Sequence, residues 1–276
     1  MSQTMIESYI EKIVRQVVTN SLQTTVVSNE NIKPIIVANW KMNMTLDSIT
    51  EFVHDFSKKS FPVDVVICPP APYLYVLNGW QIKLNATFSL GAQNVHSENN
   101  GAFTGDVSAN QLLDVGCEYV IIGHSERRAI GETNAFIHQK VKQALNTRLT
   151  PILCVGETED ERKNHKTSDV VEEQILSALQ NIEDISRVII AYEPVWAIGT
   201  GQSAAPEQAQ EVHHFIRSVL FKHFGANAGN IPILYGGSAK PENAKDFSVM
   251  PNINGLLVGG AILKADDFTK IIQAFC

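Results

Sequence analysis

The sequence lacks an excess of basic residues. Its 22 Lys and Arg residues stand against 29 Asp and Glu residues, which gives a formal net charge of -7 at pH 7. This balance supplies no basic footprint for nucleic acid or for an anionic lipid surface, so we expect neither as a partner. An anionic ligand must then be bound by local geometry, because the overall charge does not attract it.

Paired cysteines and long hydrophobic runs are also missing. The four cysteines are Cys68, Cys117, Cys154 and Cys276. They form no CxxC pair and have no histidine at ligand spacing, which argues against a disulfide scaffold and against a zinc site. We therefore expect no bound metal and a reducing, cytoplasmic location. No apolar run reaches the roughly 18 residues of a membrane span, so we expect no insertion into a membrane. No apolar run near the N-terminus precedes a cleavage site, so we expect no secretion.

Short apolar runs alternate with longer segments of helical periodicity from Ile35 onward. The runs are IIVANW (35–40), VDVVICP (63–69), LGAQNV (90–95), EYVIIGH (118–124), TPILCVG (150–156), RVIIAYE (187–193), IPILYGG (231–237) and GLLVGG (255–260). They carry little polar alternation, as expected for parallel strands buried on both faces, and crossover helices fit between them. Eight such units favour an α/β fold of the closed (β/α)8 barrel type.

Two of the intervening segments show the helical pattern well. Residues 160–182 indicate a charged turn followed by a helix with one apolar face, and residues 206–224 indicate another helix. Polar and reactive residues stand at the ends of the strand-like runs: Asn39, Lys41, His124, Glu193 and the Gly-rich YGGS and VGG. In a barrel these ends converge on one mouth, where sites are built.

Glu193 ends a predicted buried strand. A carboxylate beside an apolar, water-excluding segment has a raised pKa and can act as a general base. A strand-end salt bridge is the alternative role for this residue. The residues that follow, 194–198, form an apolar stretch predicted to be exposed, and residues 199–201 close it with two glycines. This pattern is typical of a lid with two hinges.

His124 lies at a strand end, just before a helix predicted to begin with Ser125 and Glu126. A helix N-terminus disfavours the imidazolium ion, so the sequence predicts a neutral ring that donates a hydrogen bond. Capping or packing is the alternative role. Lys41 follows the first run and can supply a fixed positive charge, although a surface lysine is its alternative.

Three glycine-containing segments are candidates for holding a phosphate group. They are residues 199–201, residues 236–238 and residues 259–261. Glycine lets main-chain N–H groups approach an anion, and a following helix start adds a favourable dipole. The last two segments end consecutive strand-like runs, where barrels often place a phosphate site after the seventh and eighth strands. Each segment taken alone is more often a tight turn.

These motifs together resemble one enzyme family. The segments ANWKMN, GAQNV, GAFTG, GHSERR, CVGET, AYEPVWAIGTG, YGGS and LVGG occur in the order seen in triosephosphate isomerases. The resemblance covers residues 34–276. It implies a cofactor-free isomerase on a (β/α)8 barrel that interconverts dihydroxyacetone phosphate and D-glyceraldehyde 3-phosphate through an enediolate, as a step of glycolysis and gluconeogenesis.

The resemblance implies a role for each matching residue. It makes Glu193 the base and His124 the neutral electrophile, with Asn39 and Lys41 completing the electrostatic cradle. The implied phosphate ligands are Gly199, Gly237, Ser238, Gly259 and Gly260, and the residues that clamp the base are Ile198 and Leu257. It also implies that Ser125 holds the resting Glu193 and that Glu126 orders Lys41. Family members are homodimers, which implies that the loop around Thr104 reaches the partner's active site.

The first 33 residues lie outside the resemblance. Apolar residues recur there with helical spacing: Ile6, Tyr9, Ile10, Ile13, Val14, Val17 and Val18. We predict an N-terminal amphipathic helix over about residues 5–19, followed by a polar linker to residue 33. An isolated short helix needs a partner for its apolar face. The segment resembles peptides that recruit enzymes into bacterial microcompartments, which suggests a shell protein as a partner; a frayed end or a helix packed on its own barrel is the alternative.

Two other functions compete with the isomerase. A different barrel enzyme acting on phosphorylated sugars would share the phosphate loops but lack the paired GHSERR and AYEPVWAIGTG motifs. A catalytically idle barrel would act as a scaffold or cargo protein through its N-terminal helix. The presence of Glu193, His124 and Lys41 argues against this second alternative.

Overall fold

The computed structural model describes residues 32–198 and 203–276. The predicted helix over residues 5–19 and most of its linker lie outside the described residues, and so does Gly199. The domain boundary between residues 33 and 34 therefore stays a prediction.

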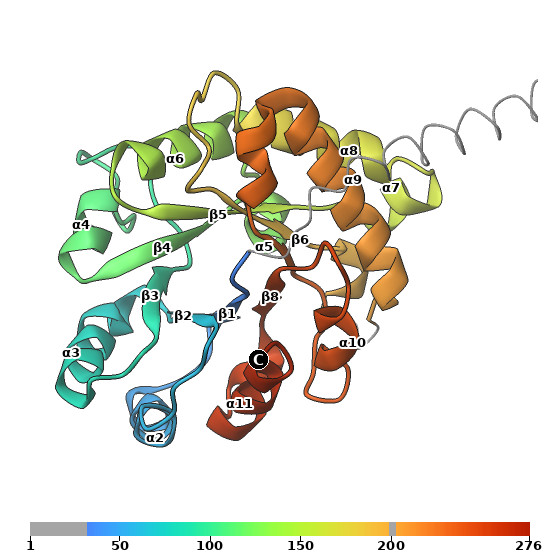
Figure 1. Ribbon diagram of the computed structural model, residues 1–276. Helices are drawn as coiled ribbons and strands as arrows, with labels where there is room; N and C mark the ends of the chain where they lie inside the picture. Colours follow the sequence, from blue (N-terminus) through green and yellow to red (C-terminus); the bar gives the residue numbers. More distant parts are fainter. Residues whose placement is uncertain (1–31, 199–202) are drawn as a thin grey trace, which may run out of the picture. The chain divides into compact units, whose positions relative to one another are not determined.

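Eight parallel strands of the described chain close into a barrel in sequence order. Figure 1 shows the labelled strands inside a ring of helices. The strands are β1 Ile35–Asn39, β2 Asp64–Cys68, β3 Ser89–Ala92, β4 Cys117–Ile122, β5 Thr150–Val155, β6 Ile189–Tyr192, β7 Ile233–Tyr235 and β8 Gly255–Val258. Strand β1 closes the ring, because it pairs with β2 on one side and with β8 on the other. The (β/α)8 barrel predicted from the eight apolar runs is confirmed.

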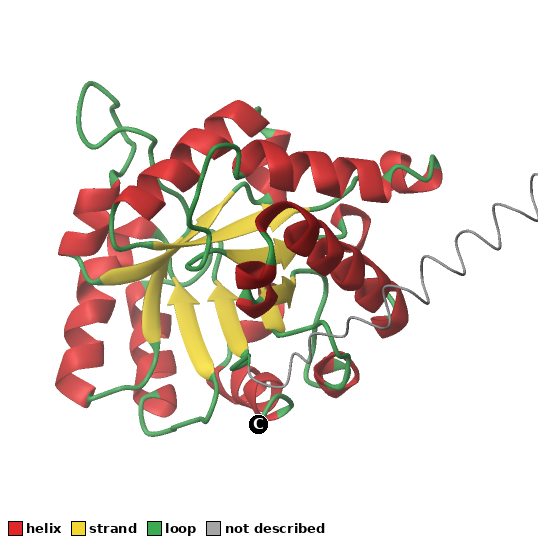
Figure 2. Ribbon diagram, turned by 45° about the horizontal axis from the view of Figure 1, so that its top comes forward, coloured by secondary structure: helices red, strands yellow, loops and turns green. Residues whose placement is uncertain are grey.

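Helices surround the barrel, with the strands at the centre (Figure 2). They are α2 Leu46–Phe56, α3 Leu74–Leu84, α4 Ala109–Asp114, α5 Ser125–Ala129, α6 Asn134–Asn146, α7 Glu159–Lys163, α8 Thr167–Ala178, α9 Pro206–Phe224, α10 Ala244–Ser248 and α11 Ala265–Gln273. Short 3-10 turns add η1 Ala71–Tyr73, η2 Val195–Ala197, η3 Ala226–Asn230 and η4 Gly260–Ile262.

The strands are buried on both faces because alternate residues enter two different cores. In β1, Ile35 and Val37 belong to a core inside the barrel, whereas Ile36 and Ala38 pack in the larger core under the helices. Both sets are apolar, which explains the absence of polar alternation in the sequence. The barrel is thus a filled scaffold, and open space is confined to its ends.

Outer helices close on the barrel through apolar faces. The buried residues of α2 are Ile49, Phe52, Val53 and Phe56. Phe56 stacks on Phe268 of α11, with 5.2 Å between ring centroids. This contact joins the first outer helix to the last and completes the ring of helices.

The charged segment predicted as a turn before α8 is in part a helix of its own. Residues 159–163 form α7, and Thr158 accepts a hydrogen bond from the backbone of Glu161 at 3.3 Å. The Glu161 carboxylate in turn accepts from the Thr158 backbone at 2.8 Å, which completes a capping box. The prediction was wrong because such a box supplies two partners for a helix start, even where few apolar residues follow.

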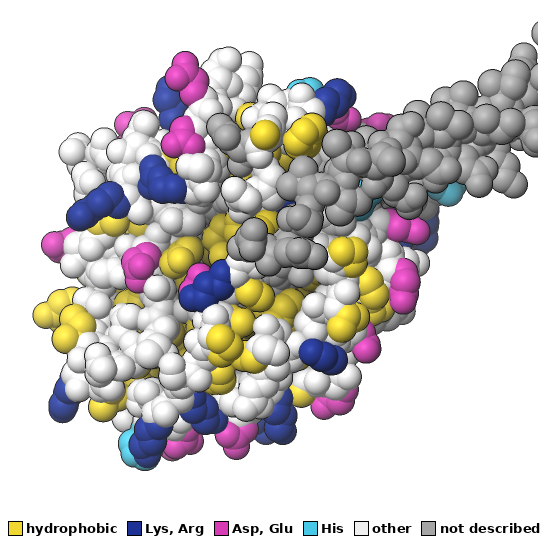
Figure 3. All heavy atoms as spheres, in the orientation of Figure 1, with side chains coloured by type: hydrophobic (Ala, Val, Ile, Leu, Met, Phe, Trp, Pro, Cys, Tyr) yellow, Lys and Arg dark blue, Asp and Glu magenta, His cyan; other side chains and the backbone are white. Residues whose placement is uncertain are grey.

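Lys, Arg, Asp and Glu side chains are intermixed on the face shown in Figure 3. They form no continuous basic patch there, in agreement with the net charge of -7. Within residues 32–198 and 203–276, no helix is long and apolar enough to cross a membrane.

Stability should fall on mild acidification because of His213 in α9. This side chain is fully buried, its Nδ1 atom lies 3.0 Å from the carbonyl oxygen of Asn252, and its Nε2 atom has no hydrogen-bond partner. Burial, helped by the charge of Arg217, lowers the pKa of His213 to about 3. Since the unfolded chain binds the proton near pH 6.5, stability is complete above that pH and is lost as pH falls, by up to about 1.4 kcal/mol per pH unit.

Urea unfolding of the wild type and of His213→Gln between about pH 6.5 and about pH 5 checks this expectation. The slope of the unfolding free energy against pH should be shallower in the variant. The control is His54→Gln, because the side chain of His54 is 70% exposed and its removal should leave the slope unchanged. Equal slopes in the wild type and His213→Gln would contradict the expectation.

Candidate active site

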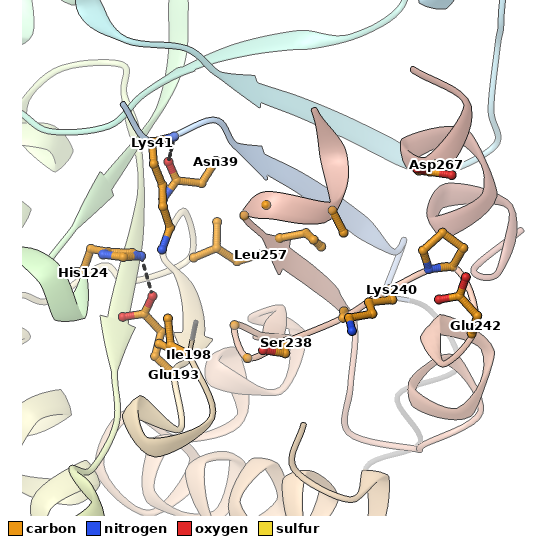
Figure 4. A pocket seen from close by; sticks show the side chains of 18 residues that line it. Asn39, Lys41, His124, Glu193, Ile198, Ser238, Lys240, Glu242, Leu257 and Asp267 are labelled. Atoms are coloured by element: carbon orange, nitrogen blue, oxygen red, sulfur yellow. Dashed lines mark hydrogen bonds and ion pairs between the residues drawn. The ribbon is translucent and has the colours of Figure 1, made fainter. Parts of the chain in front are cut away.

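A pocket of about 520 Å³ lies at the carboxyl ends of the strands. Its walls contain Asn39, Lys41, His124, Glu193, Ile198, Gly236, Gly237, Ser238, Leu257, Gly259 and Gly260, together with residues 239–242, Val258, Ala261 and Asp267. Figure 4 shows that Glu193 and His124 face each other at one end of the pocket, with Lys41 and Asn39 close by. The barrel thus brings together residues from β1, β4, β6, β7 and β8 that lie far apart in the sequence.

Glu193 follows β6 directly and is only 2% exposed. Its backbone N–H donates to the carbonyl oxygen of Val155 at 2.7 Å, which continues the pairing of β6 with β5 and fixes the start of the side chain. Its carboxylate accepts a hydrogen bond from the backbone N–H of Ser125 at 2.8 Å. The main chain of Ser125 therefore binds the carboxylate of Glu193.

His124 caps the N-terminus of α5. Its Nδ1 atom accepts a hydrogen bond from the backbone N–H of Glu126 at 3.2 Å, so the proton of the neutral ring resides on Nε2. Nε2 lies 2.9 Å from Oε1 of Glu193 and faces the pocket. The helix start therefore selects the tautomer that presents a donor to a bound ligand.

Opposing effects act on the pKa of His124. Burial lowers it, but the charge and hydrogen bond of Glu193, together with the charge of Glu126, outweigh burial and raise the pKa above its ordinary value. The prediction of a neutral ring considered the helix start alone and left out these carboxylates. Protonation of Nδ1 would, however, break the bond from Glu126 N–H, which favours the neutral ring.

Asn39 and Lys41 follow β1 and lie against the same end of the pocket. The Asn39 side chain is 6% exposed and accepts from the backbone N–H of Lys41 at 3.0 Å. Lys41 adopts a left-handed backbone conformation with φ of 50°, and Gln93 donates to its carbonyl oxygen at 2.9 Å. The Lys41 ammonium group lies 2.7 Å from the carboxylate of Glu126. The positive charge is thereby held in place from two neighbouring loops.

The far side of the pocket consists largely of main chain. A Cβ atom on Gly237 would lie 2.3 Å from the hydroxyl of Tyr235, so only glycine fits there. Gly259 and Gly260 come immediately after β8, where η4 begins. The hydroxyl of Ser238 donates to the carbonyl oxygen of Ala197 at 2.7 Å. Glycines at these positions let main-chain groups come close to an anion, and an incoming anion would compete for the Ser238 hydroxyl.

The start of the predicted lid is anchored on a buried carboxylate. Glu157 is 0% exposed and accepts hydrogen bonds from Tyr192, Trp196 and Arg162 at 3.1, 3.0 and 3.0 Å. The Arg162 guanidinium also lies 4.5 Å from the centre of the Trp196 ring. The prediction that residues 194–198 are exposed was wrong: Pro194 and Ala197 are buried and the other three are partly buried, because the segment turns back into a 3-10 helix, η2.

Two apolar side chains flank the region of Glu193. Leu257 is 3% exposed at the end of β8, and Ile198 is partly buried next to η2. Figure 4 shows Ile198 beside Glu193, with Leu257 on the side nearer to Lys41. Apolar neighbours limit the access of water to this carboxylate.

Thr104 is exposed and does not line the pocket of its own chain. The described residues contain no group of three or more His, Cys, Asp and Glu side chains arranged to hold a metal ion.

Gln93, Glu157 and Lys240 are among the residues of the site for which the sequence predicted no role. Gln93 joins the loop after β3 to that after β1, and Glu157 anchors η2 across 39 positions of sequence. Gln93 lies near the end of the run at 90–95 and Glu157 directly follows the run at 150–156, which is close to the signal that identified Glu193 and His124. Lys240 differs, because its only sequence signal is its position two residues after Ser238.

Comparison with known proteins agrees with this geometry. The family model described as triosephosphate isomerase matches residues 34–275. The triosephosphate isomerase of Carboxydothermus hydrogenoformans is 49% identical over 251 residues, which cover 87% of this chain and 98% of that protein. The enzymes of Aquifex aeolicus and Herminiimonas arsenicoxydans are 48% and 47% identical, over 87% and 88% of this chain and 99% of each relative. On this similarity and this arrangement of residues, the chain belongs to the triosephosphate isomerase family.

Proposed function

We propose that this protein interconverts dihydroxyacetone phosphate and D-glyceraldehyde 3-phosphate by moving a proton between two adjacent carbons. The observation that carries the proposal is the contact of 2.9 Å between Glu193 Oε1 and His124 Nε2 at the wall of a pocket. One group is a base and the other a donor, and a carbonyl compound bound beside them in the pocket can meet both at once. The substrate is a phosphorylated triose, in keeping with the family.

The residues divide the chemistry between them. Glu193 removes a proton from the carbon next to the carbonyl group and returns it to the neighbouring carbon, where the new C–H bond forms. His124 donates a hydrogen bond from Nε2 to the oxygen that becomes negative, and it moves protons between the two oxygens. Lys41 and Asn39 stabilise the same developing negative charge. These roles need no group beyond the side chains that line the pocket.

The phosphate group binds at the opposite side of the pocket. Backbone N–H groups of Gly237, Ser238, Gly259 and Gly260 surround it, and the Ser238 hydroxyl adds a further donor. Gly199 belongs to the same proposal but lies outside the described residues. Ile198 and Leu257 clamp Glu193 and exclude water from it. Exclusion of water also protects the enediolate, since an exposed enediolate phosphate loses its phosphate by elimination.

A coupled steady-state assay of the purified chain with glyceraldehyde 3-phosphate tests the proposal. Turnover in deuterated water should give a product that carries solvent deuterium on the carbon that gains the proton, because the proton on Glu193 exchanges with solvent. Transfer without any label would mean that Glu193 returns the proton to carbon faster than this proton exchanges with solvent. Absence of turnover in the folded protein would contradict the isomerase itself.

We propose further that two copies of the chain form a homodimer through the loop around Thr104. Residues 98–106 of this loop are exposed, including Phe103, and the neighbouring Met42 is 96% exposed. Apolar side chains left on a surface favour a protein contact. The family membership supports the same arrangement.

Thr104→Arg should shift the protein from dimer to monomer and lower its activity, because a long charged side chain would be buried at the interface. Light scattering coupled to gel filtration measures the mass, and the steady-state assay measures the activity. Thr50→Arg is the matched control, since Thr50 is exposed on the outer helix α2. An unchanged mass for Thr104→Arg at low protein concentration would contradict this interface.

For the N-terminal 33 residues we propose an amphipathic helix over residues 5–19 that binds a shell protein or another helix-binding protein. The full chain should co-sediment with candidate shell proteins, whereas the control that combines Ile10→Glu with Val14→Glu should not. Equal sedimentation of the two proteins would contradict the proposal.

We place the enzyme in the cytoplasm, within a microcompartment if the shell interaction holds. The alternative of an idle scaffold finds no support in the convergence of Glu193, His124 and Lys41 on one pocket.

A further inference from the structure

Lys240 lies in the wall of the active-site pocket, in the loop between β7 and α10. Figure 4 shows it beside Ser238, at the end of the pocket away from His124. The backbone around it is held firmly: Lys240 N–H donates to the Asn243 side chain at 2.7 Å, and its carbonyl oxygen accepts from the N–H groups of Asn243 and Ala244. The start of the side chain is therefore fixed next to the proposed phosphate site.

The ammonium group of Lys240 has no hydrogen bond or ion pair within residues 32–198 and 203–276. Lys41, the other lysine of the pocket, lies beside Gly259, but its ammonium group is 2.7 Å from the Glu126 carboxylate and is engaged there. Three carboxylates also line the pocket, those of Glu193, Glu242 and Asp267. Together with a net charge of -7, they oppose the approach of a phosphate dianion.

We propose that Lys240 captures and positions the phosphate group of the substrate at the pocket entrance. This inference rests on the proposed isomerase function and adds a residue to its phosphate site. The glycine loops offer neutral main-chain donors, which align a phosphate once it has arrived but attract it only at short range. A full positive charge acts over a longer distance and offsets the repulsion from Glu242 and Asp267.

The role predicts a particular kinetic pattern. Charge that acts on capture and binding changes kcat/KM, whereas the chemistry at Glu193 and His124 determines kcat. Removal of this charge should therefore lower kcat/KM by about 3- to 10-fold at low ionic strength and change kcat much less. The difference should shrink as salt is raised, because exposed charges are screened.

The experiment compares the wild type with Lys240→Gln and Lys240→Arg between about 0.01 M and about 0.15 M ionic strength. We expect Lys240→Gln to lower kcat/KM and to weaken the dependence of kcat/KM on salt. Lys240→Arg should retain most of the wild-type kcat/KM and most of its salt dependence. Lys245→Gln is the matched control, since Lys245 is exposed on α10, does not line the pocket and donates to Ala274 at 3.2 Å. Calorimetric titration with inorganic phosphate should show weaker binding to Lys240→Gln than to the wild type, Lys240→Arg or Lys245→Gln.

The two proposals fail in distinguishable ways. An active wild type with the same kcat/KM, salt dependence and phosphate affinity in Lys240→Gln would overturn the role of Lys240 and leave the isomerase intact. An inactive wild type would overturn the proposed function, and the phosphate titration would then decide the role of Lys240 by itself. If kcat of Lys240→Gln fell as much as its kcat/KM, the proposed role of Lys240 would also be overturned, because that result indicates a change in the chemical step.

Discussion

Glu193→Gln should lower kcat by about 10²- to 10⁴-fold in either direction of the reaction. The amide has nearly the shape of the carboxylate and can still accept the hydrogen bond from Ser125 N–H, so the pocket should keep its geometry. It cannot accept a proton from carbon, because its nitrogen and oxygen lack the basicity of a carboxylate. The coupled assay with glyceraldehyde 3-phosphate measures the loss.

Two controls assign this loss to the proton transfer. The melting temperature of Glu193→Gln and its affinity for inorganic phosphate should stay close to those of the wild type, because the amide keeps the shape of the carboxylate and four of the five proposed phosphate ligands follow β7 and β8. Glu193→Asp retains a carboxylate but withdraws it from the substrate, so it should retain more activity than the amide. Wild-type turnover by Glu193→Gln would show that another group is the base.

The barrel itself could be predicted from the sequence because its strands face two cores. Strands such as β5, with five of its six residues buried, read as unbroken apolar runs that are easy to locate. The residues at their ends were predictable for the same reason, since parallel strands deliver their carboxyl ends to one mouth. The sequence therefore predicts that His124 and Glu193 lie at the same mouth of the barrel.

Contacts across space could not be predicted in this way. Gln93 holds the Lys41 backbone across 52 positions, and Arg128 reaches the carbonyl oxygen of Cys154 across 26. No local pattern encodes such pairs, because each partner is an ordinary polar residue until the chain folds. The pKa of His124 is an example of the same kind. The start of the helix after His124 can be predicted from the sequence, whereas the Glu193 carboxylate, which raises this pKa, comes from the residue after β6.

Gly156 is a residue whose importance only the structure shows. It follows β5, and a Cβ atom built on it would lie 1.8 Å from the carbonyl oxygen of Glu193 and 2.6 Å from its carbonyl carbon. Real Cβ atoms almost never come within 3.0 Å of another atom, so the backbone of Glu193 would have to move by about 1 Å. Gln174 bonds both the N–H and the carbonyl oxygen of Gly156, at 2.8 and 3.2 Å, so Gly156 is itself restrained.

Gly156→Ala should therefore lower kcat by about 10²-fold, because a displacement of about 1 Å in the base is enough to lose the reacting geometry. Overpacking should also reduce the unfolding free energy by about 1–3 kcal/mol. Affinity for inorganic phosphate should change less than kcat, since four of the five proposed phosphate ligands follow β7 and β8. Steady-state kinetics, urea unfolding and phosphate titration measure the three effects separately.

Gly79→Ala provides the matched control for this prediction. Gly79 lies within α3, and a Cβ atom there would meet nothing within 4 Å. The same substitution should then raise the unfolding free energy by about 0.5–1 kcal/mol through helix propensity and leave kcat unchanged. A Gly156→Ala protein with normal kcat would mean that the backbone of Glu193 shifts without moving its carboxylate. The position of the base would then be determined by the bond from Ser125 and the contact with His124, and not by the packing of β6 on β5.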